Sequence, residues 1–180
     1  MKGVINKGVQ ELIEERFGQD AWDAIRAAAG NDEPSFSPSL DYPDQMTIDL
    51  VMAAAQQLNM SPDQVMIEFG KYWVTNTGKA TYPTLYALAG DNARVFLTRI
   101  DRIHSQVTAS VTGAHPPRLK AENLPEGDMR LHYGSQRRLC PVVHGLILGV
   151  GEYFSQDLSV NELNCMRRGD AECVFEVSFA

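Results

Sequence analysis

The sequence predicts an α+β fold, in which an N-terminal helical subdomain is followed by a small antiparallel sheet with one inserted helix. From the N-terminus to about residue 111, apolar residues recur three or four positions apart, the period of an amphipathic helix. Near the C-terminus they alternate with polar residues, as in a half-buried strand. We expect residues 1–180 to form one domain, because a chain of this length can bury a full hydrophobic core.

The helical part is expected to contain a series of helices separated by turn residues. The segments with helical periodicity are 5–17, 22–30, 48–58, 62–78, 85–90 and 91–111. Ser61 is expected to be an N-cap, with Pro62 at the first helical position and Gln64 three residues after the cap. Three prolines make residues 31–43 a loop, and Asp91 is expected to cap the last and longest helix.

Strand patterns appear after the two prolines that follow this helix. Leu131 and Tyr133 alternate with polar neighbours, and residues 171–179 place mostly apolar side chains on one face and polar side chains on the other. Gly169 and Asp170 suit the turn of the last hairpin. Residues 138–154 return to a helical pattern and are expected to form the inserted helix.

Composition narrows the classes of partner and compartment. The formal net charge of −7 argues against a nucleic-acid backbone or an anionic membrane surface as the main partner. The N-terminus lacks the apolar run of a signal peptide, and no stretch approaches the roughly 20 apolar residues that span a bilayer. We therefore expect a cytoplasmic protein. Three cysteines, an odd number, favour thiols or a metal site over a disulfide framework.

His104 is the first candidate ligand, because it falls on the apolar side of the long predicted helix. The apolar residues around it are Ile100, Ile103, Val107 and Val111. An imidazole there must find a partner or stay neutral. Periodicity leaves two interpretations open: a core histidine bonded to a backbone carbonyl, or the proximal ligand of a haem iron. The other histidines, His115, His132 and His144, are interpreted as non-ligands.

Tyr133, Ser135 and Arg137 form the second candidate group. On a strand, residues two apart point the same way, so a phenol, a hydroxyl and a guanidinium would share one face. All three donate hydrogen bonds, and the guanidinium matches carboxylates such as the two propionates of a haem. An exposed polar strand face would give the same pattern.

Together these features resemble the haem nitric oxide/oxygen binding (H-NOX) family, in its stand-alone bacterial form. The features are the helical histidine, the sequence Gly-Ala-His-Pro-Pro-Arg at 113–118 and the Tyr-x-Ser-x-Arg motif at 133–137. The segments 1–4, 69–73 and 145–147 are similar to the family too, so the resemblance covers nearly the whole chain. It implies a haem b buried between the helices and the sheet, with His104 on the iron. It also implies that Tyr133, Ser135 and Arg137 clamp the propionates and that Pro117 presses on the porphyrin.

The resemblance also indicates which gas is bound. Family members that hold O₂ stably use a distal tyrosine, and the matching position here is Val142. The other distal positions are Ile5, Val9, Trp73, Val74 and Leu146. All are apolar apart from the indole N–H of Trp73, so we expect NO and CO to be favoured over O₂.

The family implies a sensor rather than an enzyme. NO binding breaks the bond between iron and His104, the haem relaxes against Pro117, and the moved helix is read by a partner. We expect that partner to be a separate protein, a histidine kinase of two-component signalling or a cyclic-di-GMP enzyme, because the sequence up to Ala180 contains neither domain. A haem peroxidase would need a distal His or Arg, and the inferred distal positions contain neither.

Cys140, Cys165 and Cys173 form a third candidate group. Three thiolates and one further ligand make a closed tetrahedral zinc site, and some H-NOX proteins carry zinc on three cysteines and a histidine. The histidine position is Glu162 here, which leaves the zinc and its fourth ligand open. The alternatives are three separate buried cysteines or a redox disulfide. Two other functions therefore stay open: a redox sensor acting through the cysteines, and a haem-free interaction module.

Overall fold

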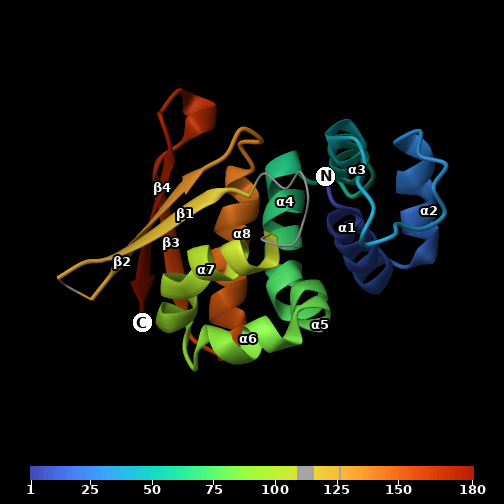
Figure 1. Cartoon of the computed structure of the whole chain (residues 1–180). Coiled ribbons are helices and arrows are strands. Elements are labelled where there is room, and N and C mark those ends of the chain that lie inside the picture. Colours follow the sequence, from blue (N-terminus) through green and yellow to red (C-terminus); the bar gives the residue numbers. More distant parts are fainter. Residues whose placement is uncertain (109–115, 126) are drawn as a thin grey trace.

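The computed structural model describes residues 1–108, 116–125 and 127–180, and it has the predicted α+β class. Figure 1 shows a sheet at one side of the molecule, with α8 and α7 beside it, α4 next, and α1–α3 at the opposite side. The helices are α1 (Gly3–Phe17), α2 (Gln19–Ala28), α3 (Asp44–Gln57), α4 (Pro62–Tyr72), α5 (Gly78–Thr81), α6 (Pro83–Ala89), α7 (Ala93–Thr108) and α8 (Cys140–Phe154). The strands are β1 (Arg118–Asn123), β2 (Met129–Gly134), β3 (Leu158–Asn164) and β4 (Cys173–Phe179).

The cap of α4 follows the prediction. The backbone N–H of Gln64 donates to the Ser61 hydroxyl at 3.1 Å, and the backbone N–H of Ser61 donates to the Gln64 side chain at 2.8 Å. A cap of this kind stabilises a helix by about 1 kcal/mol. The cap of α7 differs from the prediction: the side chain of Asn92, not that of Asp91, accepts from the N–H of Val95 at 2.9 Å.

The helix that begins at Pro62 does not end near Gly78 as predicted. Its α-helical part stops at Tyr72, and a π-helical turn, η1 (Trp73–Thr77), leads into α5. Three hydrogen bonds connect the end of α4 and the η1 turn to glutamates of α1. The donors are the side chains of Tyr72, Asn76 and Thr77. These partners lie far away in sequence, which explains why local periodicity did not reveal the turn.

The sheet is antiparallel, with strand order β1-β2-β4-β3. In its register, Tyr133 of β2 lies opposite Leu119 of β1 and Cys173 of β4. The prediction that Ser135 and Arg137 continue the β2 face is wrong, because β2 ends at Gly134 and the chain turns there. Figure 1 shows β1 and β2 as a long hairpin.

Helices α4 and α8 pack through glycines on both sides. A Cβ added to Gly70 would lie 2.6 Å from the backbone nitrogen of Leu146, and one added to Gly145 would lie 2.8 Å from the carbonyl carbon of Ile67. Both contacts are with backbone, which cannot move aside as a side chain can. The two helix backbones therefore touch, and this contact fixes the wall that carries Val142 and Leu146.

The core has three clusters. The largest lies between the sheet, α7 and α8 and includes Phe96, Leu131 and Phe175. A second, around Trp22 and Leu50, joins α1, α2 and α3. The third, between α1 and α4, is formed by Val9, Leu12, Phe69 and Tyr72. Each fully buried apolar side chain of this size contributes about 1.5–3 kcal/mol.

Two further observations complete the fold. Within the described ranges, no helix is long and apolar enough to cross a membrane. Val111, expected on the apolar side of the long helix, and His115, interpreted as a non-ligand, lie outside the described residues.

Candidate functional site

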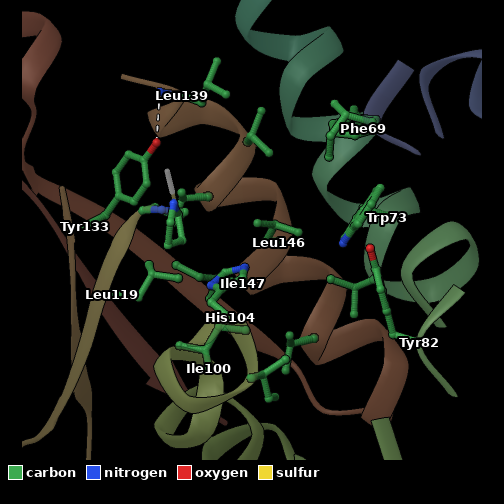
Figure 2. Close-up of a pocket in the computed structure, with 18 of the residues that line it drawn as sticks. Phe69, Trp73, Tyr82, Ile100, His104, Leu119, Tyr133, Leu139, Leu146 and Ile147 are labelled. Carbon is green, nitrogen blue, oxygen red and sulfur yellow. Dashed lines mark hydrogen bonds between the residues drawn. The ribbon is translucent and has the colours of Figure 1, made fainter. Parts of the chain in front are cut away.

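A cavity of about 360 Å³ lies where α7, α8, β1, β2 and the α4–η1 segment meet (Figure 2). This volume is within the range of small-molecule sites, roughly 300–1,000 Å³. Its wall is mostly apolar, with contributions from Leu97, Ile100, Leu119 and Ile147. The cavity is therefore suited to a flat apolar ligand that enters between the helical part and the sheet.

His104 projects from α7 into this cavity, beside Ile100 (Figure 2). Burial lowers the pKa of its imidazole, and the nearby carboxylate of Asp101 opposes this only in part. A neutral imidazole at neutral pH is the form that binds a metal through a ring nitrogen.

Tyr133 and Arg137 also line the cavity, whereas Ser135 does not. The Tyr133 hydroxyl accepts a hydrogen bond from the backbone N–H of Leu139 at 3.2 Å (Figure 2). The Ser135 hydroxyl accepts from the backbone N–H of Arg137 at 3.2 Å, so it shapes the turn that carries the guanidinium. The three residues are brought together by a turn after β2 and not by a straight strand.

Asp44, at the start of α3, holds Arg137 from the helical side. Arg137 Nε donates to Asp44 Oδ2 at 2.7 Å, and its Nη2 donates to Oδ1 at 3.4 Å. The bond to Arg137 is the main cause of a lowered pKa at Asp44. Sequence reasoning missed this residue, which is 93 positions away from its partner.

The expected distal residues form one wall, with one exception. Ile5, Trp73, Val74, Val142 and Leu146 all line the cavity, and so does Pro117. Val9 does not: it packs with Leu12, Phe69 and Tyr72 in the core between α1 and α4. Val9 follows Ile5 by one helical turn, and at that height α1 faces α4 instead of the cavity.

Two tyrosines that sequence reasoning missed also line the cavity. Tyr82 lies directly before α6 and Tyr86 lies within it. Their spacing of four residues corresponds to about one helical turn, a signal that the sequence contained, although Tyr82 itself has non-helical dihedral angles. Burial raises the pKa of both hydroxyls.

The residues around the cavity fit a haem. The apolar walls match the macrocycle, the His104 imidazole is a normal iron ligand, and the hydroxyl and guanidinium of Tyr133 and Arg137 match the propionates. When bound, a haem supplies the iron that takes a diatomic ligand.

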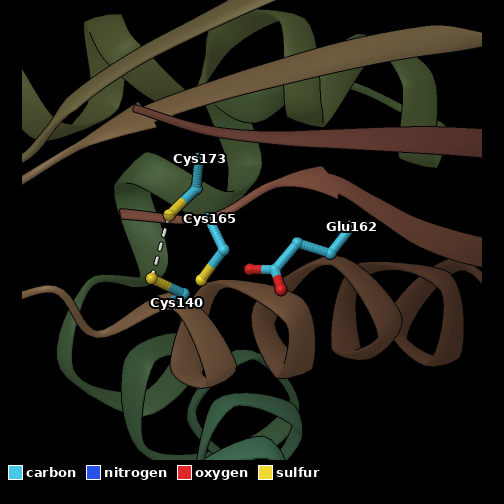
Figure 3. Close-up of side chains that lie close together, drawn as sticks. All are labelled: Cys140, Glu162, Cys165 and Cys173. Atoms are coloured by element: carbon cyan, nitrogen blue, oxygen red, sulfur yellow. Dashed lines mark hydrogen bonds between the residues drawn. The ribbon is translucent and has the colours of Figure 1, made fainter. Parts of the chain in front are cut away.

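The second site lies at the start of α8, outside this cavity. One ligand atom from each of Cys140, Cys165, Cys173 and Glu162 lies within 4.8 Å of the others (Figure 3). The Sγ atoms of Cys140 and Cys173 are 2.9 Å apart. All three cysteines are buried. In a tetrahedral zinc site the sulfurs lie about 3.8 Å apart, so small side-chain movements would complete one.

The protonation of these thiols depends on what they bind. Burial and the two neighbouring thiols raise the pKa of Cys140, which keeps it protonated without a cation. Glu162 has another partner, the guanidinium of Arg168 at 2.8 Å. His144 lines the same hollow, and burial lowers its pKa.

Comparisons with known proteins agree with this geometry. A model of the family described as Haem-NO-binding matches residues 2–162. Soluble guanylate cyclase gcy-32 of Caenorhabditis elegans is 25% identical over 153 residues, which are 83% of this chain and 22% of that protein. The guanylate cyclase soluble subunit beta-2 of Rattus norvegicus is 30% identical over 98 residues, which are 53% of this chain and 14% of that protein. The chain therefore spans less than a quarter of either relative.

Solved structures share the fold over its full length. An H-NOX protein from S. oneidensis in the Fe(II)NO ligation state has a TM-score of 0.91 and 22% identity, with 100% of this chain and 99% of that one covered. An oxygen-binding H-NOX domain related to soluble guanylate cyclases has a TM-score of 0.84 and 23% identity, covering 99% and 95%. Since the family match extends over most of the chain, this protein belongs to the Haem-NO-binding, or H-NOX, family.

Proposed function

We propose that this protein binds haem b through His104 and senses nitric oxide, with carbon monoxide as a second ligand and no stable O₂ complex. An H-NOX domain is a sensor domain and not a catalytic one. The observation that carries the proposal is the His104 imidazole, which points into an apolar cavity that Tyr133 and Arg137 also line.

The choice of gas rests on the cavity wall formed by Ile5, Val142 and Leu146. None of these side chains has a hydrogen-bond donor. The family resemblance implies that Val142 is at the position of the distal tyrosine of O₂-holding members. Bound O₂ is polar and gains more from a donor than NO or CO does. The oxygen-binding solved structure has the same fold, so the fold alone does not decide the ligand.

His104 links the cavity to the rest of the molecule. It lies on α7, which packs against β1 and α8. His104 would hold a bound iron, so loss of that contact would free α7 from one of its anchors. Pro117, a rigid ring in the cavity wall, would resist movement on the sheet side. A shift of α7 then changes the surface that a partner contacts.

We propose that this surface is read in the cytoplasm by a separate protein, either a histidine kinase or a cyclic-di-GMP enzyme. The formal net charge of −7 favours a basic patch on a protein partner over nucleic acid or an anionic membrane.

A second candidate function is a redox-sensitive zinc site on Cys140, Cys165, Cys173 and Glu162. The compact arrangement of these four side chains favours it. Oxidation of the thiols would release the ion and loosen the connection between β3 and β4. Zinc content before and after mild peroxide tests this, and an unchanged content with unchanged signalling would remove it.

Absorption spectra test the main proposal. The ferrous protein should give a Soret band, shift to a five-coordinate type of spectrum with NO, bind CO, and form no stable oxy species in air. His104→Gly should lose haem and regain it when imidazole is added, while His132→Gly, on the outer face of the sheet, should behave as wild type. A protein without a Soret band after haem supplementation would instead be the haem-free interaction module.

A further inference from the structure

Two cationic side chains line the cavity that His104 enters, and the Tyr133 clamp includes only one of them. Arg137 lies on the turn after β2, whereas Lys2 lies directly before α1. Within the described part of the chain, no other lysine or arginine lines the cavity. A haem carries two propionate carboxylates, and carboxylates bind most strongly to cationic donors. The cavity wall therefore offers one cation for each of them.

The backbone position of Lys2 is fixed by a short antiparallel bridge to the loop before α3, in which Lys2 lies opposite Asp41. The N–H of Gly3 donates to the carbonyl of Leu40 at 2.8 Å. A Cβ added to Gly3 would lie 3.0 Å from the carbonyl carbon of Ser37, so the two segments are in close backbone contact. Residues directly opposite each other in an antiparallel pair have side chains on the same face. The bridge therefore brings the ammonium of Lys2 and the carboxylate of Asp41 together at the cavity wall, which both residues line.

Lys2 and Arg137 are held by two aspartates that lie three residues apart. Arg137 Nε donates to Asp44 Oδ2 at 2.7 Å, and Lys2 Nζ donates to Asp41 Oδ2 at 2.7 Å. The amino nitrogen of Met1 donates to the other oxygen of Asp44, also at 2.7 Å. Because Lys2 follows Met1 directly, the two cations lie at the same edge of the cavity.

The Lys2 ammonium has donors left for a further partner. An ammonium has three N–H donors, and Asp41 is its one hydrogen-bond partner among the residues that the structure describes. The side chain of Lys2 is 32% exposed and that of Asp41 is 69% exposed, so the pair lies at the boundary between the cavity and solvent. A carboxylate at this edge can therefore bind Lys2 without displacing Asp41.

We propose that Lys2 binds one haem propionate and is a second cation of the clamp, beside Arg137. This inference rests on the proposed function, because it requires a haem in the cavity. The competing interpretation is that Lys2 only ties the segment before α1 to Asp41, and exposed pairs of that kind stabilise a protein little. The two interpretations differ in one respect, because only the first depends on the carboxylates of the porphyrin.

Haem loss from the full chain to apomyoglobin tests the inference. Lys2→Met keeps most of the length of the side chain but removes its charge, so we expect haem loss to become about threefold to tenfold faster. Lys2→Arg should restore a rate near that of wild type, because a guanidinium also binds carboxylates. Lys7→Met is the matched control: Lys7 pairs with Glu11 on α1 at 3.4 Å and does not line the cavity, so the rate should not change.

Haem dimethyl ester, which has the same ring but no charge on its two propionates, separates the two interpretations. With this probe, wild type and Lys2→Met should lose the porphyrin at equal rates. Equal loss of ordinary haem from both proteins, or the same acceleration with the ester, would overturn the inference and leave the proposed function intact. A wild type without a Soret band would overturn the proposed function and this inference with it.

Discussion

At the scale of single residues, the edge of the cavity carries a charged pair, whereas the histidine inside the cavity is uncharged. Arg137 is held by the carboxylate of Asp44 at one edge of the cavity, while His104 is kept neutral inside it by burial. The two opposite effects come from environment, because Asp44 remains hydrated and His104 does not.

The buried imidazole makes the haem-free protein sensitive to acid. Burial holds the folded pKa of His104 below its ordinary value of 6.5, so the unfolded chain takes up the proton first. The stability from this residue is therefore complete above pH 6.5 and is lost as pH falls below it. Urea unfolding of the haem-free protein should show this decline, and His104→Leu should show a smaller one. An identical pH dependence in both would contradict the assignment.

The Asp44–Arg137 pair should matter more for haem retention than for stability. Both side chains are more than a third exposed, and pairs of this kind contribute about 0–1 kcal/mol. Asp44→Asn should therefore change the midpoint of urea unfolding little, but it should speed haem transfer to an acceptor such as apomyoglobin. Asp63→Asn, which removes the partner of Arg167 away from the cavity, is the control. Equal transfer rates for both variants would show that Asp44 does not position the clamp.

At the scale of elements, the contact between α1 and the η1 turn decides where the Trp73 side chain lies. The Tyr72 hydroxyl donates to Glu15 at 2.6 Å, and the Thr77 hydroxyl donates to Glu11 at 2.6 Å. Gly8 lets the helices approach, since a Cβ there would lie 3.1 Å from Phe69 and 3.3 Å from Trp73.

Breaking these bonds should destabilise the protein measurably. A hydrogen bond to a charged acceptor contributes about 1.5–3 kcal/mol, so Tyr72→Phe and Thr77→Val should each lower the free energy of unfolding by an amount in that range. Glu14→Gln, on the same helix, keeps a group that can accept from Gln10 and should change it by less than about 0.5 kcal/mol. Urea titration of the three variants measures these changes. If Tyr72→Phe and Thr77→Val changed the free energy of unfolding no more than Glu14→Gln does, the hydrogen bonds to α1 would not stabilise the protein.

The elements also show how far sequence reasoning reaches. Helical periodicity and the Ser61 cap predicted most of the helical part, because those signals are local. Strand β1 was missed because its one buried residue is Leu119, so its pattern has no alternation to detect. The π-helical turn and the turn after Gly134 depend on contacts with distant residues, and so does the pairing of Asp44 with Arg137. Of the candidate haem ligands, His104, Tyr133 and Arg137 line the cavity and Ser135 does not. The positions of Val9 and Tyr86 depend on tertiary packing, which the sequence pattern did not reveal.

At the scale of the whole molecule, the cavity lies between two hydrophobic core clusters, one in the helical part and one against the sheet. The cluster around Trp22 and Leu50 holds α1–α3 together, and the cluster around Phe175 holds α7 and α8 on the sheet. Residues from both sides, Ile5 and His104 among them, meet at the cavity.

We expect NO to loosen the part of the sheet-side cluster that contains α7 and β1, and to leave β3 unchanged. Amide hydrogen exchange should become faster in α7 and β1 when NO is added to the haem-loaded protein, because the anchor at His104 is lost, and it should stay unchanged in β3. His104→Gly with added imidazole should show no such change, because its ligand is no longer tied to the backbone. Equal exchange rates with and without NO in wild type would rule out a signal that is carried by α7 and β1.

The contact between Gly70 and Gly145 has a consequence for how the protein measures its ligands. With backbone against backbone, the distance between α4 and α8 is set by atoms that have no alternative rotamers. The backbone of Leu146, on α8, and that of Trp73, directly after α4, therefore keep a constant distance from each other. The backbone frame of this wall can therefore widen only if α4 and α8 move apart as whole helices.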